Sequence, residues 1–177
     1  MGFLTKQSAV LLPCDPGLLY EVLTDYDSYA EWMPFVARSK LLARERDLAL
    51  AEFELLHPAK DVFVVECIHT KNKMVLWRAI RGRIPLSEAQ WDIEPAEGGQ
   101  VRVRLTFQTN LNWGLLRPAY SRFLKTAPCL NALRMQISAF LPELAPEEGE
   151  KILEIAETSE GTICWMLGKK YILTPAP

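Results

Sequence analysis

The sequence is poor in the side chains that bind metal ions. It has two histidines, His57 and His69, and four cysteines that lie far apart and form no Cys-x-x-Cys pair. A zinc site needs a cluster of cysteine and histidine ligands at short spacing. We therefore expect no metal site, no cofactor and thiols that remain reduced.

Long apolar runs are also missing. No run reaches the ~20 residues that a helix needs to span a bilayer, so we expect no membrane span. The first residues, Met-Gly-Phe-Leu-Thr-Lys, have neither a basic region before an apolar core nor a small-residue cleavage site. The sequence thus predicts no secretory signal, and with reduced thiols it favours the cytoplasm.

An excess of positive charge is absent as well. The net charge is −2, and residues 143–177 alone carry −4, from seven acidic and three basic side chains. The remaining residues 1–142 are nearly neutral and lack the basic surface that binding to phosphate backbones requires. This charge distribution predicts no DNA binding and argues against RNA or the ribosome as a partner.

Motifs for common catalytic chemistry are not found either. The sequence shows no phosphate-binding loop and no nucleophile–base pair at a recognised spacing. Its 49% hydrophobic and 24% charged residues are ordinary for a globular protein. We expect one domain over residues 1–142, followed by a separate extension over residues 143–177.

What the sequence does contain is a series of strand signals between Val36 and Leu111. In the last of them, over residues 101–108, apolar and polar side chains alternate, which predicts a strand with one buried face. Turn signals separate the strands, and no segment between them is long enough for a helical crossover. The sequence therefore predicts an antiparallel meander.

Three helices are expected around these strands. A first strand at residues 5–12 precedes a helix that begins at Asp15-Pro16, and a short helix follows over residues 26–32. Apolar residues recur at steps of three and four from Leu115 to Leu141, which predicts one long amphipathic helix. Pro128 lies inside it and should kink or split it.

The extension has its own predicted structure. Residues 146–157 read as a short acidic helix, and residues 162–174 read as an apolar hairpin with a turn at Gly168-Lys169. In a structural role, the hairpin extends the sheet edge or covers the core. In a functional role, it closes the mouth of a cavity or packs on a second subunit. The last alternative predicts a homodimer.

Several local features resemble one protein family. They are the Asp-Tyr…Tyr…Trp-Met-Pro segment within residues 24–34, Gly82 followed by Trp91, the Gly98-Gly99 turn, and Arg117-Pro118. Over residues 5–141 the chain resembles the polyketide cyclase/dehydrase branch of the START-like (SRPBCC) superfamily, which includes coenzyme Q-binding proteins. The resemblance implies an α+β helix-grip fold, a curved antiparallel sheet around a long C-terminal helix. The helix and hairpin extension over residues 143–177 has no counterpart in this resemblance and is predicted from its sequence pattern alone.

The resemblance also implies a function. It predicts that the protein binds or transports a hydrophobic small molecule, such as a lipid, quinone or polyketide, in a cavity between the sheet and the C-terminal helix. The alternative is an enzyme, an aromatase/cyclase acting on a polyketide chain, and a second alternative is a ribosome-associating protein. We expect binding without catalysis, because one fold supports many functions and no catalytic motif is present.

Candidate ligand contacts are large apolar or aromatic side chains on the expected sheet face, the loop before it and the long helix. They are Trp32, Met33, Phe35, Phe53, Trp77, Trp91, Phe107, Tyr120 and Leu124. Those near Pro34 either cover a ligand or plug the core, and those on the strands either line a pocket or form the core. Tyr120 either hydrogen-bonds a ligand carbonyl or lies at the surface.

Three side chains are candidates for acid–base or polarising chemistry: Arg81, Glu66 and Tyr120. Arg81 shares a strand face with Trp77, so it either enters the cavity or lies exposed in water. Glu66 interrupts an apolar alternation and is either an acid or base, or one half of a static ion pair. His69 lies on the opposite strand face from Glu66, so we do not expect the two to form a dyad.

Overall fold

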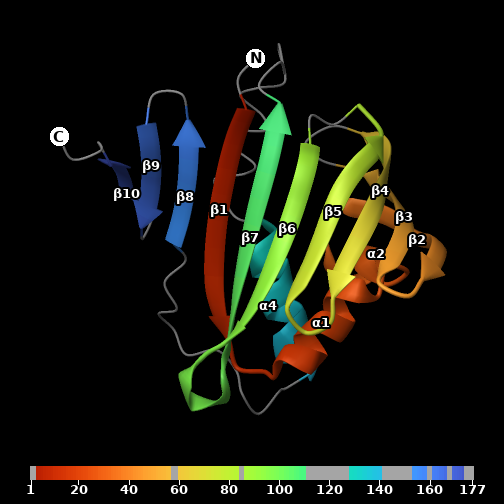
Figure 1. Cartoon of the computed structure of the whole chain (residues 1–177), viewed down its shortest axis with the longest axis horizontal. Helices are drawn as coiled ribbons and strands as arrows, with labels where there is room; N and C mark the ends of the chain where they lie inside the picture. Colours follow the sequence, from red (N-terminus) through yellow and green to blue (C-terminus); the bar gives the residue numbers. More distant parts are fainter. Residues whose placement is uncertain are drawn as a thin grey trace.

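The computed structural model describes residues 3–56, 60–83, 86–110, 128–140, 153–158, 161–166 and 169–173. Its strands form one antiparallel sheet in the order β10-β9-β8-β1-β7-β6-β5-β4-β3-β2 (Figure 1). The strands are β1 Phe3–Leu12, β2 Val36–Glu45, β3 Leu48–Leu55, β4 Asp61–Thr70, β5 Met74–Arg81, β6 Leu86–Pro95, β7 Val101–Asn110, β8 Leu153–Thr158, β9 Gly161–Met166 and β10 Lys169–Leu173. The helices are α1 Pro16–Thr24, α2 Tyr29–Trp32, the 3-10 turn η1 Glu97–Gly99, and α4 Pro128–Phe140.

The first helix starts where its sequence predicts. The carboxylate of Asp15 accepts hydrogen bonds from the backbone N–H groups of Gly17 and Leu18, at 2.8 and 3.0 Å. Pro16 occupies the first turn, where no backbone donor is needed. The short helix α2 begins three residues later than expected and ends before Pro34, because a residue that precedes proline avoids helical geometry.

The α-helices lie on one face of the sheet, and the core forms between them and that face (Figure 1). Along β7 the buried residues Val101, Val103 and Leu105 alternate with more exposed ones, as the period of a strand requires. The predicted α+β class is confirmed, and the predicted antiparallel meander is present as β2 to β7, with β1 paired to β7 as the seventh strand.

Irregular pairing bends the sheet at one side. The register between β4 and β5 shifts at Val64 and Val65, and both of these neighbouring side chains are buried. Gly82 follows β5 with a φ of +134°. A bulge of this kind increases the local twist and bends its strand.

The described strands of the C-terminal extension continue the sheet beyond β1. β8 pairs with β1 from Leu153 to Glu157, β9 with β8, and β10 with β9. The hairpin predicted for residues 162–174 is present as β9 and β10. The helix predicted for residues 146–157 is wrong over residues 153–157, which belong to the strand β8. The open edge of β1 offers backbone hydrogen bonds that local propensity does not reveal.

The long helix predicted for residues 115–141 is described from Pro128 to Phe140 only. Residues 115–127, which include the candidates Tyr120 and Leu124, lie outside the described residues. Within α4, Leu130, Leu133 and Ile137 are fully buried, and the helix packs against β1 and α2. None of the helices described is long and apolar enough to cross a membrane.

Candidate functional site

An aromatic cluster fills one part of the interior. Its members come from α2 and the segment before it, and from β3 to β6: Tyr26, Tyr29, Trp32, Phe53, Phe63, Trp77 and Trp91. Ring centroids are 5.0 Å apart for Phe53 and Trp77, 5.3 Å for Tyr29 and Trp77, and 4.7 Å for Tyr29 and Trp32. These separations are those of aromatic rings in direct contact.

Five of the predicted ligand contacts come together in or beside this cluster. Trp32, Met33, Phe53, Trp77 and Trp91 are all buried, and Met33 is only 2% exposed. The other two described candidates, the half-buried Phe35 and Phe107, pack against the same core. The structure thus brings the described candidates into one continuous apolar interior.

Two indole N–H groups are buried in this interior. The indole N–H of Trp91 is buried, and so is that of Trp77, and neither meets a hydrogen-bond acceptor among the described residues. Burying a donor without a partner costs about 1–3 kcal/mol. A ligand carbonyl beside such a donor would recover that cost.

A second polar feature is the contact between Tyr26 and His69. The Tyr26 hydroxyl and His69 Nε2 share a hydrogen bond of 2.6 Å, and their rings stack with centroids 5.8 Å apart. Burial lowers the pKa of His69, and the nearby Arg44 guanidinium adds to this. Burial also raises the pKa of Tyr26. The pair is therefore an imidazole that stays neutral and a phenol that keeps its proton.

The sequence analysis did not assign a role to His69, although a signal was present. It placed His69 on the strand face opposite Glu66, and Glu66 faces outward. The period of two along β4 therefore turns His69 inward. Its partner Tyr26 lies 43 residues away in the sequence, and only the tertiary fold brings the two together.

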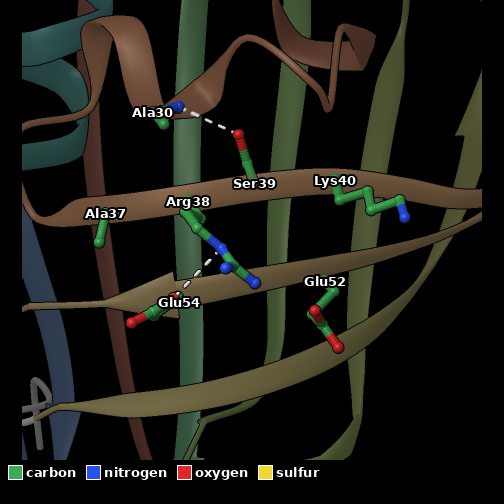
Figure 2. A pocket seen from close by; sticks show the side chains of 7 residues that line it. All are labelled: Ala30, Ala37, Arg38, Ser39, Lys40, Glu52 and Glu54. Atoms are coloured by element: carbon green, nitrogen blue, oxygen red, sulfur yellow. Dashed lines mark hydrogen bonds and ion pairs between the residues drawn. The ribbon is translucent and has the colours of Figure 1, made fainter.

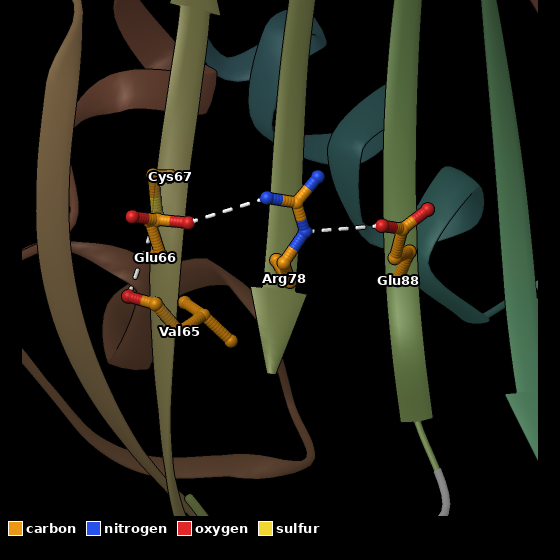
Figure 3. A network of polar contacts seen from close by, with 5 residues as sticks. All are labelled: Val65, Glu66, Cys67, Arg78 and Glu88. Carbon is orange, nitrogen blue, oxygen red and sulfur yellow. Dashed lines mark hydrogen bonds and ion pairs between the residues drawn. The ribbon is translucent and has the colours of Figure 1, made fainter. Parts of the chain in front are cut away.

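The two described candidates for acid–base chemistry lie away from the aromatic cluster. Glu66 pairs with Arg78 at 3.5 Å on the outer face, and Arg78 also pairs with Glu88 at 3.1 Å (Figure 3). All three side chains reach solvent, and Arg81 is exposed as well. In this arrangement Glu66 belongs to an ion-pair network, and surface pairs of this kind contribute little to stability.

A surface hollow of about 410 Å³ lies beside α2, the edge strand β2 and its neighbour β3 (Figure 2). Its walls include Arg38, Lys40, Glu52 and Glu54, and Arg38 pairs with Glu54 at 3.3 Å. Charged walls that already balance one another do not suit an apolar ligand. The described part of the chain also contains no group of three potential metal ligands.

Solved structures with the same arrangement define the class of fold. A START superfamily protein from Mycobacterium smegmatis superposes with a TM-score of 0.65 at 14% identity, over 79% of this chain and 99% of that one. The Zhui aromatase/cyclase from a Streptomyces species gives 0.67 at 12% identity, over 83% and 98%. A protein from Thermus thermophilus gives 0.65 at 19% identity, over 76% and 97%. At these identities the likeness shows the fold, which is START-like.

The sequence itself identifies the family. The pattern of the polyketide cyclase / dehydrase and lipid transport family matches residues 12–128, more than half of the chain. The chain belongs to this family, and the resemblance inferred from its local segments is confirmed. A search of curated proteins by sequence found no match.

Proposed function

We propose that the protein binds and carries a hydrophobic small molecule, lipid-, quinone- or polyketide-like, between the sheet and the C-terminal helix. The observation that supports this most directly is the buried indole N–H of Trp91, which has no acceptor in the described part of an interior otherwise rich in aromatic and aliphatic groups. Ligand sites of this kind combine apolar walls with a few polar groups that fix orientation.

In this proposal, apolar burial supplies the affinity and the N–H donor sets the orientation of the ligand. Removing apolar ligand surface from water supplies about 25 cal/mol per Å², so the affinity comes mainly from burial. A single N–H donor adds orientation, because a quinone or polyketide carbonyl, or a lipid ester, has to face it. Membership of a family that includes lipid transport supports the same class of ligand.

Conversion of the ligand is the second candidate function. It is favoured by the structural likeness to the Zhui aromatase/cyclase and to the di-domain aromatase/cyclase StfQ, which has a TM-score of 0.64 at 19% identity. A cyclase needs an ionisable or polarising group beside its substrate. Glu66 and Arg81 are exposed and do not meet this requirement. A cyclase reaction would therefore need another ionisable or polarising group, one that faces the interior.

The experiment that tests the proposal is native mass spectrometry of the freshly purified protein, followed by solvent extraction and identification of what is released. We expect an apolar molecule at near one per chain. An empty protein that also fails to take up added fatty acid, quinone and polyketide would contradict the proposal. Release of a cyclised product after incubation with a linear poly-ketone would favour the enzyme.

A matched pair of variants tests the part played by Trp91. Trp91→Phe keeps an aromatic ring and removes the N–H donor, and we expect it to weaken binding of a carbonyl ligand about 3- to 10-fold, in line with one neutral hydrogen bond. The control is Met135→Leu on α4, whose side chain is 75% exposed. Equal binding by Trp91→Phe and the unaltered protein would contradict a role for the N–H group.

A further inference from the structure

Apolar side chains are exposed at one end of the sheet, where β3 ends, β4 begins and β5 ends. Leu56, Val62 and Ile80 are 41%, 46% and 57% exposed, although large aliphatic side chains are usually buried. Leu56 follows β3 directly, Val62 is the second residue of β4, and Ile80 is the last but one of β5. A single exposed side chain of this kind needs no explanation, but these three occur on three neighbouring strands.

The register of β3 and β4 brings Leu56 and Val62 together. Val62 stands opposite Glu54, so Leu56, two residues beyond Glu54, is its diagonal neighbour. Diagonal neighbours lie about 7–8 Å apart, within reach of long side chains. Val62 also shares a strand face with Glu66, whose carboxylate pairs with Arg78 on the side away from the helices (Figure 3). Val62 therefore lies on the outer face of the sheet.

The register shift between β4 and β5 turns both Ile80 and Arg81 to this outer face. Ile80 is two residues beyond the outward-facing Arg78 and is the residue that the shift inserts into β5. Past the shift, Arg81 stands opposite Val64, which the period of two along β4 also places outward. Val64 is only 6% exposed, so neighbouring side chains cover it. A regular strand would instead have kept Arg81 on the face of Trp77, where the sequence pattern placed it.

Positive charge accompanies these apolar side chains. Three cationic side chains are exposed at the same end of the sheet: Lys60, Arg81 and Arg83. The one acidic residue between Lys60 and Val64, Asp61, accepts hydrogen bonds from the backbone N–H groups of Val62 and Arg83, at 3.0 and 2.7 Å. This end of the sheet is therefore positively charged, in a chain whose net charge is −2.

We infer that this end of the sheet docks on a membrane surface that contains anionic lipids. The docking patch consists of three apolar and three cationic side chains: Leu56, Val62, Ile80, Lys60, Arg81 and Arg83. Apolar side chains enter the boundary between lipid headgroups and acyl chains, while cations are attracted to the negative surface. The inference rests on the proposed function, because a carrier of an apolar molecule has to exchange it with an apolar phase.

The docking patch lies back to back with the aromatic cluster. Phe63 follows Val62 on β4 and is buried on the inner face, where it stacks on Phe53 with centroids 5.3 Å apart. Gly82 passes so close to this side chain that an added Cβ atom would lie 2.6 Å from the Cβ of Phe63. A membrane at the patch is thus separated from the aromatic interior by the thickness of one strand.

A protein partner or a second copy of the chain is the competing occupant. A specific protein interface buries about 800 Å² on each side, far more than three half-exposed aliphatic side chains offer. The nearest acidic side chain on β3, Glu54, already pairs with Arg38 at 3.3 Å. Docking on lipid depends instead on apolar area plus attraction to anionic headgroups, which is the combination found here.

The test is co-sedimentation of the full-length protein with vesicles of phosphatidylcholine, made with and without phosphatidylserine. We expect tighter binding to the anionic vesicles, and weaker binding as salt is added. The double variant Arg81→Gln, Arg83→Gln should bind them about 10- to 30-fold more weakly, at roughly five-fold for each cation. The matched control is Lys71→Gln, Lys73→Gln, which removes two exposed cations from the opposite ends of β4 and β5 and should bind as the unaltered protein does.

A second pair of variants tests the apolar part of the docking patch. Ile80→Ser should weaken binding to anionic vesicles about 3- to 10-fold, because its exposed side chain no longer enters the lipid boundary. The control is Leu48→Ser, at the opposite end of β3, where the side chain is 49% exposed. All four positions are at the surface, so we expect every variant to fold.

Uptake of added fatty acid or quinone, measured without vesicles, separates this inference from the proposed function. Equal binding to the two kinds of vesicle, or equal losses in patch and control variants, would overturn the inference. Self-association through the patch without binding to vesicles would also overturn it, in favour of a second copy. Uptake without vesicle binding would leave the proposed function standing alone. Patch-dependent vesicle binding without uptake would support the docking surface and contradict the proposed function.

Discussion

Tyr26 and His69 supply a polar contact within a group of residues that is otherwise aromatic. The imidazole stacks on Tyr26 and meets Tyr20 edge-on, with centroids 6.1 Å apart. Arg44 donates to the backbone carbonyl of Thr24 at 2.8 Å and lies over the Tyr26 ring. A second cation inside this arrangement would lose hydration and face Arg44, which is why the imidazole remains neutral.

The lowered pKa of His69 has a consequence for stability. The unfolded chain takes up a proton near the ordinary value of about 6.5, at a pH where folded His69 is still neutral. The unfolded state therefore binds more protons in this window, and the free energy of unfolding falls as the pH drops below about 6.5. We expect a slope of at most about 1.4 kcal/mol per pH unit from this residue, measured by urea unfolding at several pH values.

The matched variant for this prediction is His69→Gln, which retains a polar side chain but does not titrate. Its unfolding free energy should depend less on pH than that of the unaltered protein over the same range. The Asp47 carboxylate partly offsets the effect of Arg44 on the pKa of His69. The measured pH dependence of the variant is therefore compared with that of the unaltered protein. Parallel pH profiles would show that His69 does not contribute.

At the scale of single elements, Gly82 follows β5 close to the register shift between β4 and β5. Its φ of +134° is rare for residues that have a side chain, and a Cβ atom added there would lie 2.6 Å from the Cβ of Phe63. Phe63 stacks on Phe53 at a centroid separation of 5.3 Å. A change at Gly82 therefore reaches the aromatic cluster directly.

We expect Gly82→Ala to lower the free energy of unfolding by about 1–3 kcal/mol or more, because backbone strain and the contact with Phe63 act together. Chemical denaturation measures the change. The matched control is Gly98→Ala, where φ is +70° and no atom lies within 4 Å of the added Cβ. If both variants lost the same stability, the contact with Phe63 would have no separate effect.

At the scale of the whole molecule, the C-terminal extension covers one edge of the family fold. Without β8, the backbone groups of β1 from Thr5 to Ala9 would lose their partners. Exposed strand edges promote pairing with other chains. The homodimer through residues 162–174 stays a prediction, as does the division into units at residues 142 and 143.

Truncation after residue 142 tests the role of the extension. We expect the shortened chain to associate with itself, because the edge of β1 then becomes available for pairing between molecules. Light scattering coupled to size exclusion would detect a larger mass than one chain, with the full-length protein as the reference. A shortened chain that remains monomeric and equally stable would show that the extension does not protect this edge.

Local chemistry was sufficient to predict much of the fold. The alternation along residues 101–108, the Asp15-Pro16 helix start and the segment ending at Pro34 each act over a few neighbours, so their outcome can be read directly from the sequence. The same holds for the family, since its pattern lies in such short segments. The buried positions of Trp77 and Trp91 also follow from strand periodicity.

The sequence by itself therefore determined the order of the elements in the family domain, the apolar face of its meander and the class of protein. Only the tertiary structure decided that residues 153–158 form a strand, that His69 meets Tyr26 and that Lys6 is buried. The physical reason is distance along the chain. Strand pairing and the burial of a polar side chain depend on partners tens of residues away, and local propensity is too weak to outweigh what those partners offer.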